Sequence, residues 1–517
     1  MELDANVMPR QADLGPPPEA AENREDLRER LIRYLEGIAG VRDGDAGLPL
    51  DQLATQEALA AWFGPSFTEL YGKPDALRQA LDRDVAAIDD FISNQVNAIL
   101  HDASFQRLET AWRGVQFLTG IAAEISGAKI RVLPVSWNEI ARDLDRAGDF
   151  DQSQIFQKIY SNEFGTPGGE PFGLLIGDYA IHHQRTADHP TDDIGALKSL
   201  ASVAAASFAP LVLGVSPSVF QLNSFSQLGR PIELRTIFAQ GEYQRWNAMR
   251  QNEDLRFAGL VLPRLLMRLP YVDDPLRRDG FHFAEHTDSR DGSGYLWGNA
   301  AYAFGATVLR AFGNFGWFAD IRGAPRDELR GGLVYGNPIA SFATDSPGIA
   351  LKPSTECLIS EHQERDLTEL GFIPLRDIAF TEFSVFNESP SLHMPERYDR
   401  QITTINARIS AMLPYVLCVS RFAHFIKIMA RERIGSFSTA DDCQAFLQTW
   451  LGRYCEGSSD ASAETRARYP LREGTIQVKN VPGKPGTYSC TVLLRPQYQF
   501  DEVSAGFRLV TELSPAN

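Results

Sequence analysis

The spacing of apolar residues separates helical from strand-like regions of the chain. Apolar residues recur every three to four positions, as on one face of a helix, over residues 24–39, 74–120 and 400–433. Pro414 interrupts the last of these regions, so we expect the helix to kink or divide there. A shorter helix is predicted for DDCQAFLQTWLGRY, residues 441–454.

Short apolar runs in the middle of the chain read as strands. They are KIRVLPV (129–135), GLLIGDY (173–179) and APLVLGVS (209–216), and helical segments such as residues 194–208 separate them. Strands that alternate with helices indicate a sheet with crossover connections. We therefore predict a central α/β domain.

The C-terminal region changes to strict alternation of apolar and polar residues. Ile476 and Val478 alternate with polar neighbours, VPGKPG reverses the chain, and a second strand follows whose alternating residues are Tyr488, Cys490, Val492 and Leu494. A third alternating run covers residues 503–513. Because an isolated hairpin is only marginally stable, this one needs sheet partners from its own chain or from another.

One helical face in the N-terminal half carries a large aromatic residue. Within FQRLETAWRGVQFL, residues 105–118, we expect a single apolar stripe formed by Leu108, Trp112, Val115 and Leu118. Glu109 and Arg113 form an i,i+4 pair that we place away from this stripe. Trp112 is predicted to be a core or interface anchor.

The length allows more than one domain. With 517 residues, 44% hydrophobic and 23% charged, the chain can bury at least one large core. We expect a mixed α+β protein with four parts: a disordered acidic arm (1–23), an N-terminal helical segment (24–74), a central α/β domain (75–375) and a C-terminal domain containing the hairpin (376–517).

Net charge and cysteine usage narrow the class of protein. Fifty basic and 67 acidic residues give a net charge of −17, which disfavours attraction to nucleic acid or anionic lipid. Five scattered cysteines with no C-x-x-C pair indicate reduced thiols and a cytoplasmic protein. The N-terminus lacks the features of a signal peptide, and no run of 18 apolar residues occurs, so we expect no membrane insertion.

A glycine-rich stretch raises the question of a nucleotide site. In FGTPGGEPFGLLIGDY, residues 164–179, Gly165, Gly168 and Gly169 precede the predicted strand instead of following it. No lysine follows them, and Glu170 places a negative charge where a phosphate would sit. The glycines are therefore predicted to form a turn that leads into a strand.

Other catalytic or metal-binding patterns are weak. H-E-x-x-H and G-x-S-x-G are absent. His182, His183, Asp188 and His189 could gather a metal ion, but their polar, charged stretch is more typical of a surface loop. His424 lies among apolar residues, as a core histidine does. We expect no catalytic residue, no cofactor and no metal.

Six segments resemble a known family. In chain order they are FQRLETAWRG, FGTPGGEPFGLLIGDY, LRFAGLVLPRLLMRLPY, YLWGNAAYAF, SRFAHFIKIMARERIGSF and YPLREGTIQVKNVPGKPGTYSCTVLLRPQYQF. Together they span roughly residues 75 to 513 and are similar to the large subunit of the type VI secretion system contractile sheath, the TssC (VipB) family. The resemblance implies a structural, non-enzymatic protein.

The resemblance also implies partners. Such subunits pair with a small sheath subunit (TssB/VipA-like), stack with copies of themselves as hexameric rings around an inner tube of Hcp-like protein, and contract. Strands near the C-terminus interleave with those of neighbouring subunits, and residues 475–481 and 487–494 match that position. Inter-subunit strand pairing is accordingly assigned to Ile476, Val478, Tyr488, Val492 and Leu494.

The N-terminus departs from the family pattern. In some members an N-terminal helix is recognised by an AAA+ unfoldase; residues 1–45 do not match that motif, although helix 24–39 occupies a similar place. Recycling by an unfoldase and contact with a baseplate stay open. The alternatives are a static or specialised sheath-like paralogue, or an enzyme with an unrecognised site in the α/β domain.

Overall fold

The computed structural model describes residues 55–517 with internal gaps. The residues outside the description are 1–54, 275, 277–280, 289–291, 326–327, 341–351, 380, 434–438, 459, 482–487, 498–506 and 514–517. The predicted acidic arm and helix 24–39 therefore lie outside the described residues. Contacts divide the chain into two compact units, one of residues up to Asp102 with Tyr271–His286, and one of Ala103–Pro270 with Thr287–Asn517.

The first unit is helical. Its elements are α2 (Thr55–Phe63), η3 (Gly64–Ser66), α3 (Phe67–Leu70) and the long α4 (Pro74–Leu100). Trp62 Nε1 donates a hydrogen bond to Asp84 Oδ2 at 3.0 Å, which joins α2 to the buried face of α4. Near the end of α4, Asn97 Oδ1 accepts a hydrogen bond from the backbone N–H of His286 at 2.8 Å.

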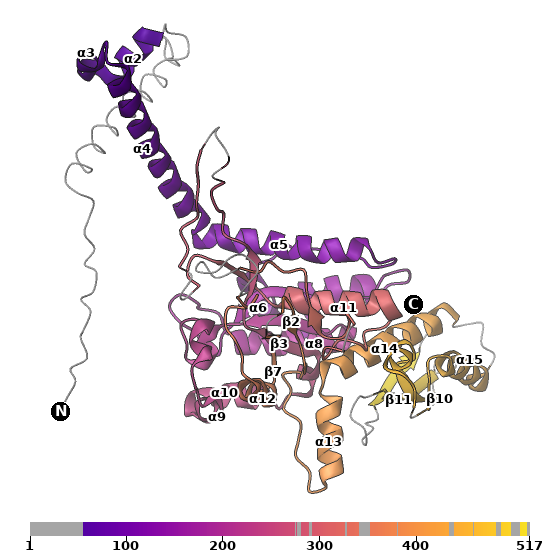
Figure 1. Cartoon of the computed structure of the whole chain (residues 1–517). Helices are drawn as coiled ribbons and strands as arrows, with labels where there is room; N and C mark the ends of the chain where they lie inside the picture. Colours follow the sequence, from indigo (N-terminus) through magenta and orange to yellow (C-terminus); the bar gives the residue numbers. More distant parts are fainter. Residues whose placement is uncertain are drawn as a thin grey trace, which may run out of the picture. The chain divides into compact units, whose positions relative to one another are not determined.

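A four-stranded parallel sheet lies at the centre of the second unit (Figure 1). Its order is β1-β2-β3-β7, with bounds Leu175–Ile181, Leu211–Val215, Ala258–Leu262 and Phe372–Pro374. The helix α8 (Asp193–Ser207) connects β1 to β2, as a parallel pair requires. The predicted strands 173–179 and 209–216 and the helix 194–208 are confirmed.

Residues on this sheet alternate between two cores. Leu211 and Leu213 of β2 pack in the same core as α8, whereas Val212 between them packs with the helix α11 (Ala301–Phe315). The alternation follows from the two-residue period of a strand, and both faces are apolar because helices cover both. This explains why these strands read as continuous apolar runs.

The predicted strand KIRVLPV is wrong. Residues 129–135 carry no strand assignment, and Val132 and Leu133 are exposed. Pro134 has no N–H to donate to a ladder, and the polar members of the run serve another purpose, since Arg131 pairs with Glu163 and Glu170. Its apolar composition is that of a strand, but the segment is irregular and its charged side chains form ion pairs.

The helix α5 (Ala103–Ala123) buries a different face from the one predicted. Its buried residues are Thr110, Gly114 and Leu118, and it packs on α11. Gly114 sets this face, because a Cβ atom there would lie 2.4 Å from the ring of Tyr302 on α11. The apolar stripe predicted on this helix is therefore only partly correct: Leu118 lies in the core, and Trp112 does not.

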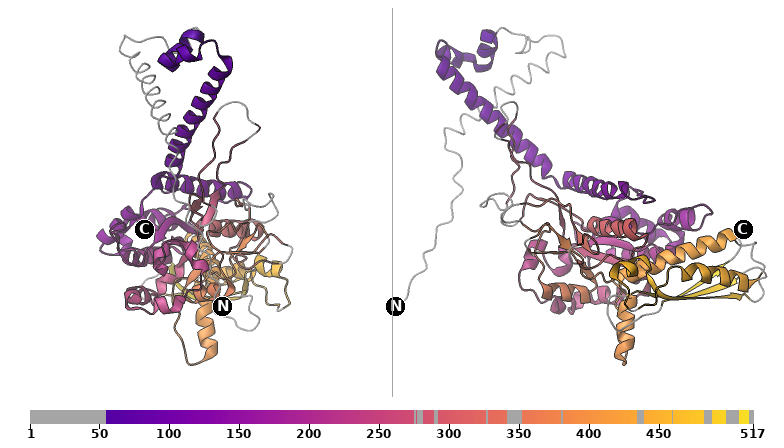
Figure 2. Two further views of the ribbon diagram at one scale, coloured as in Figure 1. Left: turned by 60° about the vertical axis from the view of Figure 1, so that its left-hand side comes forward. Right: turned by 45° about the vertical axis from the view of Figure 1, so that its right-hand side comes forward.

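The C-terminal region combines helices with an antiparallel sheet. A break at residues 411–412 separates α13 (Gln401–Ser410) from α14 (Leu413–Arg433), so Pro414 falls in the first turn of the second helix, where a missing N–H costs nothing. The predicted division is confirmed. Figure 2 shows α14 and α15 (Ala440–Gly452) beside the strands β10 (Leu471–Asn480) and β11 (Tyr488–Pro496).

Smaller elements complete the second unit, and the mixed α+β class is confirmed. The short helices are α6 (Trp137–Arg146), η4 (Phe150–Gln152), α7 (Gln154–Phe156), η5 (Gln157–Phe164), η6 (Pro217–Phe220), η7 (Phe225–Gly229), α9 (Leu234–Phe238), η8 (Gly241–Tyr243), α10 (Gln244–Met249), η9 (Glu253–Phe257), α12 (Glu361–Glu369) and α16 (Ala463–Arg468). The remaining strands are β4 (Leu265–Arg268), β5 (Leu296–Gly298), β6 (Leu333–Val334), β8 (Arg376–Asp377), β9 (Ser384–Val385) and β12 (Phe507–Leu513).

Among the described residues, one helix is long and apolar enough to be tested as a membrane span. It is α14, over Leu413–Glu432, and 72% of its most apolar window is buried inside the fold. Phe422 and Ile426 of this helix belong to the core shared with the C-terminal sheet. Burial against protein accounts for the apolar composition of α14.

Gly114→Ala tests the packing of α5 on α11. The added methyl group collides with the Tyr302 ring, so we expect the free energy of unfolding to fall by about 1–3 kcal/mol. Gly120→Ala on the same helix is the control, because no atom lies within 4 Å of its added Cβ, and better helix propensity stabilises by up to about 1 kcal/mol. Chemical denaturation measures both; equal effects at the two positions would contradict this packing.

Candidate functional site

The C-terminal sheet contains every residue assigned to inter-subunit strand pairing. Its order is β10-β11-β12 and both pairings are antiparallel. Ile476 lies opposite Val492, and the backbone of Tyr488 lies opposite Asn480 on one side and Leu513 on the other. The pairing of the two predicted hairpin strands is confirmed, and so is a third strand over Phe507–Leu513, whereas residues 482–487 of the turn and residues 503–506 lie outside the described part of the chain. One of the sheet partners that the hairpin needs thus comes from its own chain.

The apolar side chains of this sheet lie in a core of their own domain. Ile476, Val478, Val492 and Leu494 are all buried, together with residues of α14 and α15 such as Phe422, Leu447 and Leu451. These side chains stabilise the domain and are not available to a neighbouring chain. Any pairing with another subunit must therefore use main-chain groups at a sheet edge.

The outer edge of β10 is covered by two glutamines of α15. Gln448 Oε1 accepts a hydrogen bond from the backbone N–H of Ile476 at 2.8 Å, and Gln444 Oε1 accepts one from Val478 at 2.9 Å. Gln448 Nε2 in turn donates to the carbonyl oxygen of Gly474 at 2.8 Å. The helix can come this close because Gly474 has no side chain: a Cβ atom would lie 2.6 Å from Leu451 Cδ2.

These contacts fix the direction of the main-chain groups across the whole sheet. The N–H groups of Ile476 and Val478 point away from β11, so their opposite residues on β11 direct their N–H groups toward β12. Leu509 lies opposite Val492, and its N–H therefore faces β11. The N–H groups of the alternate residues on β12, among them Val510, then point outward.

The outer edge of β12 is the open edge of this sheet. Within the part of the chain that the structure describes, β12 pairs with β11 and with no other strand. An unpaired edge offers a row of N–H and C=O groups to a strand from another chain. Within the described residues, the sheet thus has one edge covered by α15 and one edge that pairs with no further strand.

Burial makes the cysteine thiol of this sheet unreactive. Desolvation raises the pKa of the Cys490 thiol to about 12, so it stays protonated and unreactive. All five cysteines are free, and four of them are buried. Arg495 pairs with Glu473 on the surface of the sheet at 2.9 Å.

A second surface lies on α5. Trp112 is 66% exposed, and Leu108 and Phe105 on the same helix are also exposed. Of the two roles expected for Trp112, the core role does not apply within this chain, and the interface role stays a prediction. The Glu109–Arg113 pair is present at 2.8 Å, but Glu109 also binds the buried Arg268 at 2.7 Å, so this pair marks the packed side of the helix.

The glycine-rich stretch is architectural, as predicted. Gly168 has a positive φ of 79°, and a Cβ atom at Gly169 would lie 2.1 Å from the carbonyl oxygen of Glu163. Glu170 binds Lys129, so both charges are satisfied. His424 is a core histidine, also as predicted, and its Nε2 lies 2.9 Å from the carbonyl oxygen of Ser207.

Sequence reasoning missed the covering of β10. The signal that could have revealed it is the pair Gln444 and Gln448, four residues apart and therefore on one helix face, just before an alternating strand. Polar residues at that spacing look like an ordinary solvated face. Only the structure shows that the two amides match the two-residue spacing of outward N–H groups on a strand.

Comparison with known proteins identifies relatives of this chain. Residues 82–393 match the VipB family model, the EvpB/VC_A0108 tail sheath N-terminal domain, and residues 402–513 match VipB_2, the tail sheath gpW/gp25-like domain. The chain is 39% identical over 447 residues to the type VI secretion system sheath protein TssC1 of Pseudomonas aeruginosa, covering 86% of this chain and 87% of that protein.

Two solved structures show weaker likeness. The sheath tail protein of Desulfitobacterium hafniense matches at a TM-score of 0.30 and 8% identity, covering 65% of this chain and 57% of that one. A chain of the anti-feeding prophage baseplate matches at 0.27 and 9% identity, covering 63% and 64%. Scores this low carry no argument about the fold, so the kinship rests on the sequence matches.

Proposed function

Because the chain belongs to the VipB family of type VI secretion tail sheath proteins, we propose that it is the large subunit of a contractile sheath. In this proposal it assembles with a small sheath subunit into a helical cylinder of hexameric rings, around an inner tube of Hcp-like protein, in the cytoplasm. Contraction of the cylinder drives the tube forward. Its role is mechanical, with no catalytic step. The match of both tail sheath models in chain order carries the proposal.

The open edge of β12 supports a main-chain link between subunits. A contracting lattice needs connections that persist while rigid cores change their packing. Hydrogen bonds along an added strand fit this need, because they depend on local register and not on side-chain contacts of the two cores. We assign the link between subunits to the outward N–H groups of β12. The core around Ile476 and Val492 holds that edge in place.

The exposed apolar surface of α5 supports a second, side-chain contact between subunits. Large aromatic residues are enriched at the centres of protein interfaces, and an exposed tryptophan flanked by Leu108 and Phe105 is unusual on a surface that stays in water. We assign this surface to contact with a neighbouring sheath subunit.

Co-expression with the small sheath subunit tests the proposed function. We expect the purified product to form hollow tubules visible by negative-stain electron microscopy, and the chain expressed alone to form none. Discrete soluble particles that contain both folded proteins would instead support a static or specialised sheath-like paralogue. That result would also reopen the alternative of an enzyme.

Val510→Pro tests the link at β12. Proline removes an N–H that points outward and therefore leaves the ladder with β11 intact. We expect the variant to fold with a near-normal melting temperature and to lose tubules. Val510→Ala keeps the N–H and should assemble, whereas Leu509→Pro removes an inward N–H and should cost about 3 kcal/mol or more of stability. Tubules of normal yield and length from Val510→Pro would refute the assignment.

Trp112→Ala tests the surface of α5. Because the ring is 66% exposed, we expect the free energy of unfolding of the isolated chain to change by less than about 1 kcal/mol. Tubule yield on co-expression should fall, while Arg107→Ala, an exposed residue on another face of the same helix whose contacts are with Ala103 and Ser104 of that helix, should leave it unchanged. A Trp112→Ala variant that assembles as well as the parent chain would exclude α5 from the interface.

A further inference from the structure

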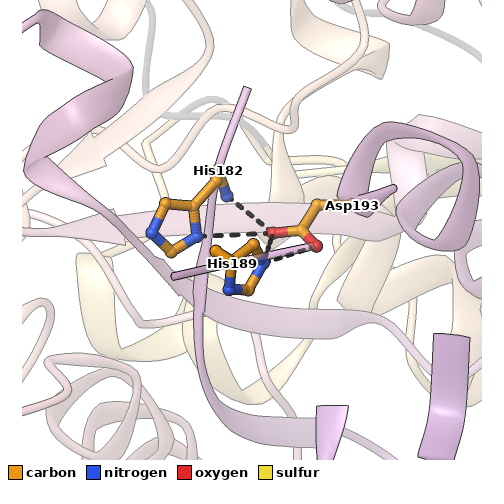
Figure 3. Close-up of side chains that lie close together, drawn as sticks. All are labelled: His182, His189 and Asp193. Carbon is orange, nitrogen blue, oxygen red and sulfur yellow. Dashed lines mark hydrogen bonds and ion pairs between the residues drawn. The ribbon is translucent and has the colours of Figure 1, made fainter. Parts of the chain in front are cut away.

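The connection between β1 and α8 gathers two histidines around one carboxylate. His182 follows β1, His189 lies in the middle of the connection, and Asp193 is the first residue of α8. Figure 3 shows both imidazole rings on the same side of the Asp193 carboxylate. The sequence places His182, His183, Asp188 and His189 in this connection, but the structure selects a different set, because Asp188 is exposed and Asp193 takes its place.

The three side chains present their ligand atoms to one point. His189 Nε2 lies 2.8 Å from Asp193 Oδ2, and His182 Nδ1 lies 3.5 Å from the same oxygen. The two rings stack with centroids 3.9 Å apart, and one ligand atom from each of the three residues lies within 4.8 Å of the others. In a tetrahedral zinc site with bonds of about 2.0–2.1 Å, ligand atoms are separated by roughly 3.3 Å, close to this spacing.

A second layer of hydrogen bonds holds the carboxylate in this orientation. Asp193 Oδ1 accepts from Trp137 Nε1 at 2.7 Å and from Thr191 Oγ1 at 2.7 Å, and Oδ2 accepts from the backbone N–H of His182 at 2.8 Å. Support of this kind around a ligating carboxylate fixes its geometry before a metal arrives. These donors therefore prepare Asp193 as a ligand.

Two features of the cluster point to a cation. Asp193 has only 1% of its side chain exposed, and within the described residues it forms ion pairs with the two histidines. His182 Nδ1 is buried and makes no hydrogen bond, since its 3.5 Å contact with Asp193 Oδ2 is a long ion pair. A cation between the three groups would offset the buried negative charge and give this nitrogen a closer partner.

We propose that His182, His189 and Asp193 form a binding site for a divalent transition-metal ion of the zinc class. Two imidazoles and one carboxylate suit Zn²⁺ better than Ca²⁺ or Mg²⁺, which prefer oxygen ligands. The side chains of His182 and His189 are 21% and 23% exposed, so solvent reaches the site and water supplies the fourth ligand. An ion bound here would replace the contacts that His189 Nε2 makes with Asp193 Oδ2 at 2.8 Å and with Thr191 Oγ1 at 2.7 Å.

The site would stabilise the local fold. It ties the end of β1 to the first turn of α8 across a connection of eleven residues, 182–192, that contains no regular secondary structure. Asp192, next to the site, is already paired with Arg245 at 2.9 Å and is not a ligand. This function is independent of sheath assembly, so the metal site and the proposed sheath role can fail separately.

Binding of Zn²⁺ by the purified full-length chain tests the proposal. After gel filtration of the Zn²⁺-loaded protein, we expect about one zinc per chain by elemental analysis, and competition with a coloured chelator gives the affinity. His189→Gln keeps a donor for Asp193 and should preserve the fold while lowering the affinity by about 100-fold. Trp137→Phe removes a positioning contact and should lower it by about 10–100-fold. Zn²⁺ should raise the melting temperature of the parent chain and not of His189→Gln.

Two controls separate this site from adventitious binding. Asp188→Asn changes an exposed carboxylate in the same connection, and His362→Ala changes an exposed histidine on α12. Both should bind zinc as the parent chain does. The proposal is overturned if the parent chain retains no stoichiometric zinc, or if His189→Gln and His182→Ala, with normal circular dichroism, retain as much zinc as the two controls.

Discussion

Every main-chain N–H and C=O group needs a hydrogen-bond partner, and this requirement determines how the edges of the C-terminal sheet are arranged. An antiparallel sheet leaves such groups unpaired along both edges, and an uncovered edge pairs with whatever strand it meets. In this chain Gln444 and Gln448 satisfy one edge through contacts of 2.8–2.9 Å. Within the described residues, β12 is the edge of this sheet that pairs with no further strand.

Because of this requirement, the packing of α15 on β10 bears on the proposed strand addition at β12. The glutamines reach β10 because Gly474 lets α15 approach closely, and α15 is held there by the core that includes Leu447, Leu451 and the buried faces of β10 and β11. In the proposed assembly, the apolar residues of the hairpin thus act indirectly. They fix the plane and register of the sheet, and the register decides which N–H groups on β12 face outward.

Sequence patterns predicted much of this architecture because buried positions recur along the chain with the period of the helix or strand that contains them. The two-residue alternation of Ile476 and Val478, and the continuous apolar runs of β1 and β2, follow from one buried face and two buried faces respectively. Prediction failed where a single close contact overrides periodicity. Gly114 packs against Tyr302, so Trp112 on the other side of α5 faces outward, and residues 129–135 join no strand although their run is apolar. Similarly, no local pattern shows that Asp193, four residues beyond His189, completes a cluster with His182.

Strand addition at β12 can be tested by residue-level hydrogen–deuterium exchange before and after assembly with the small sheath subunit. We predict that the amides of Leu509 and Thr511 are protected in both states, because they face β11. The amides of Arg508, Val510 and Glu512 should exchange quickly in the free chain and become protected in tubules. Rapid exchange of these three amides in intact tubules would contradict strand addition at this edge.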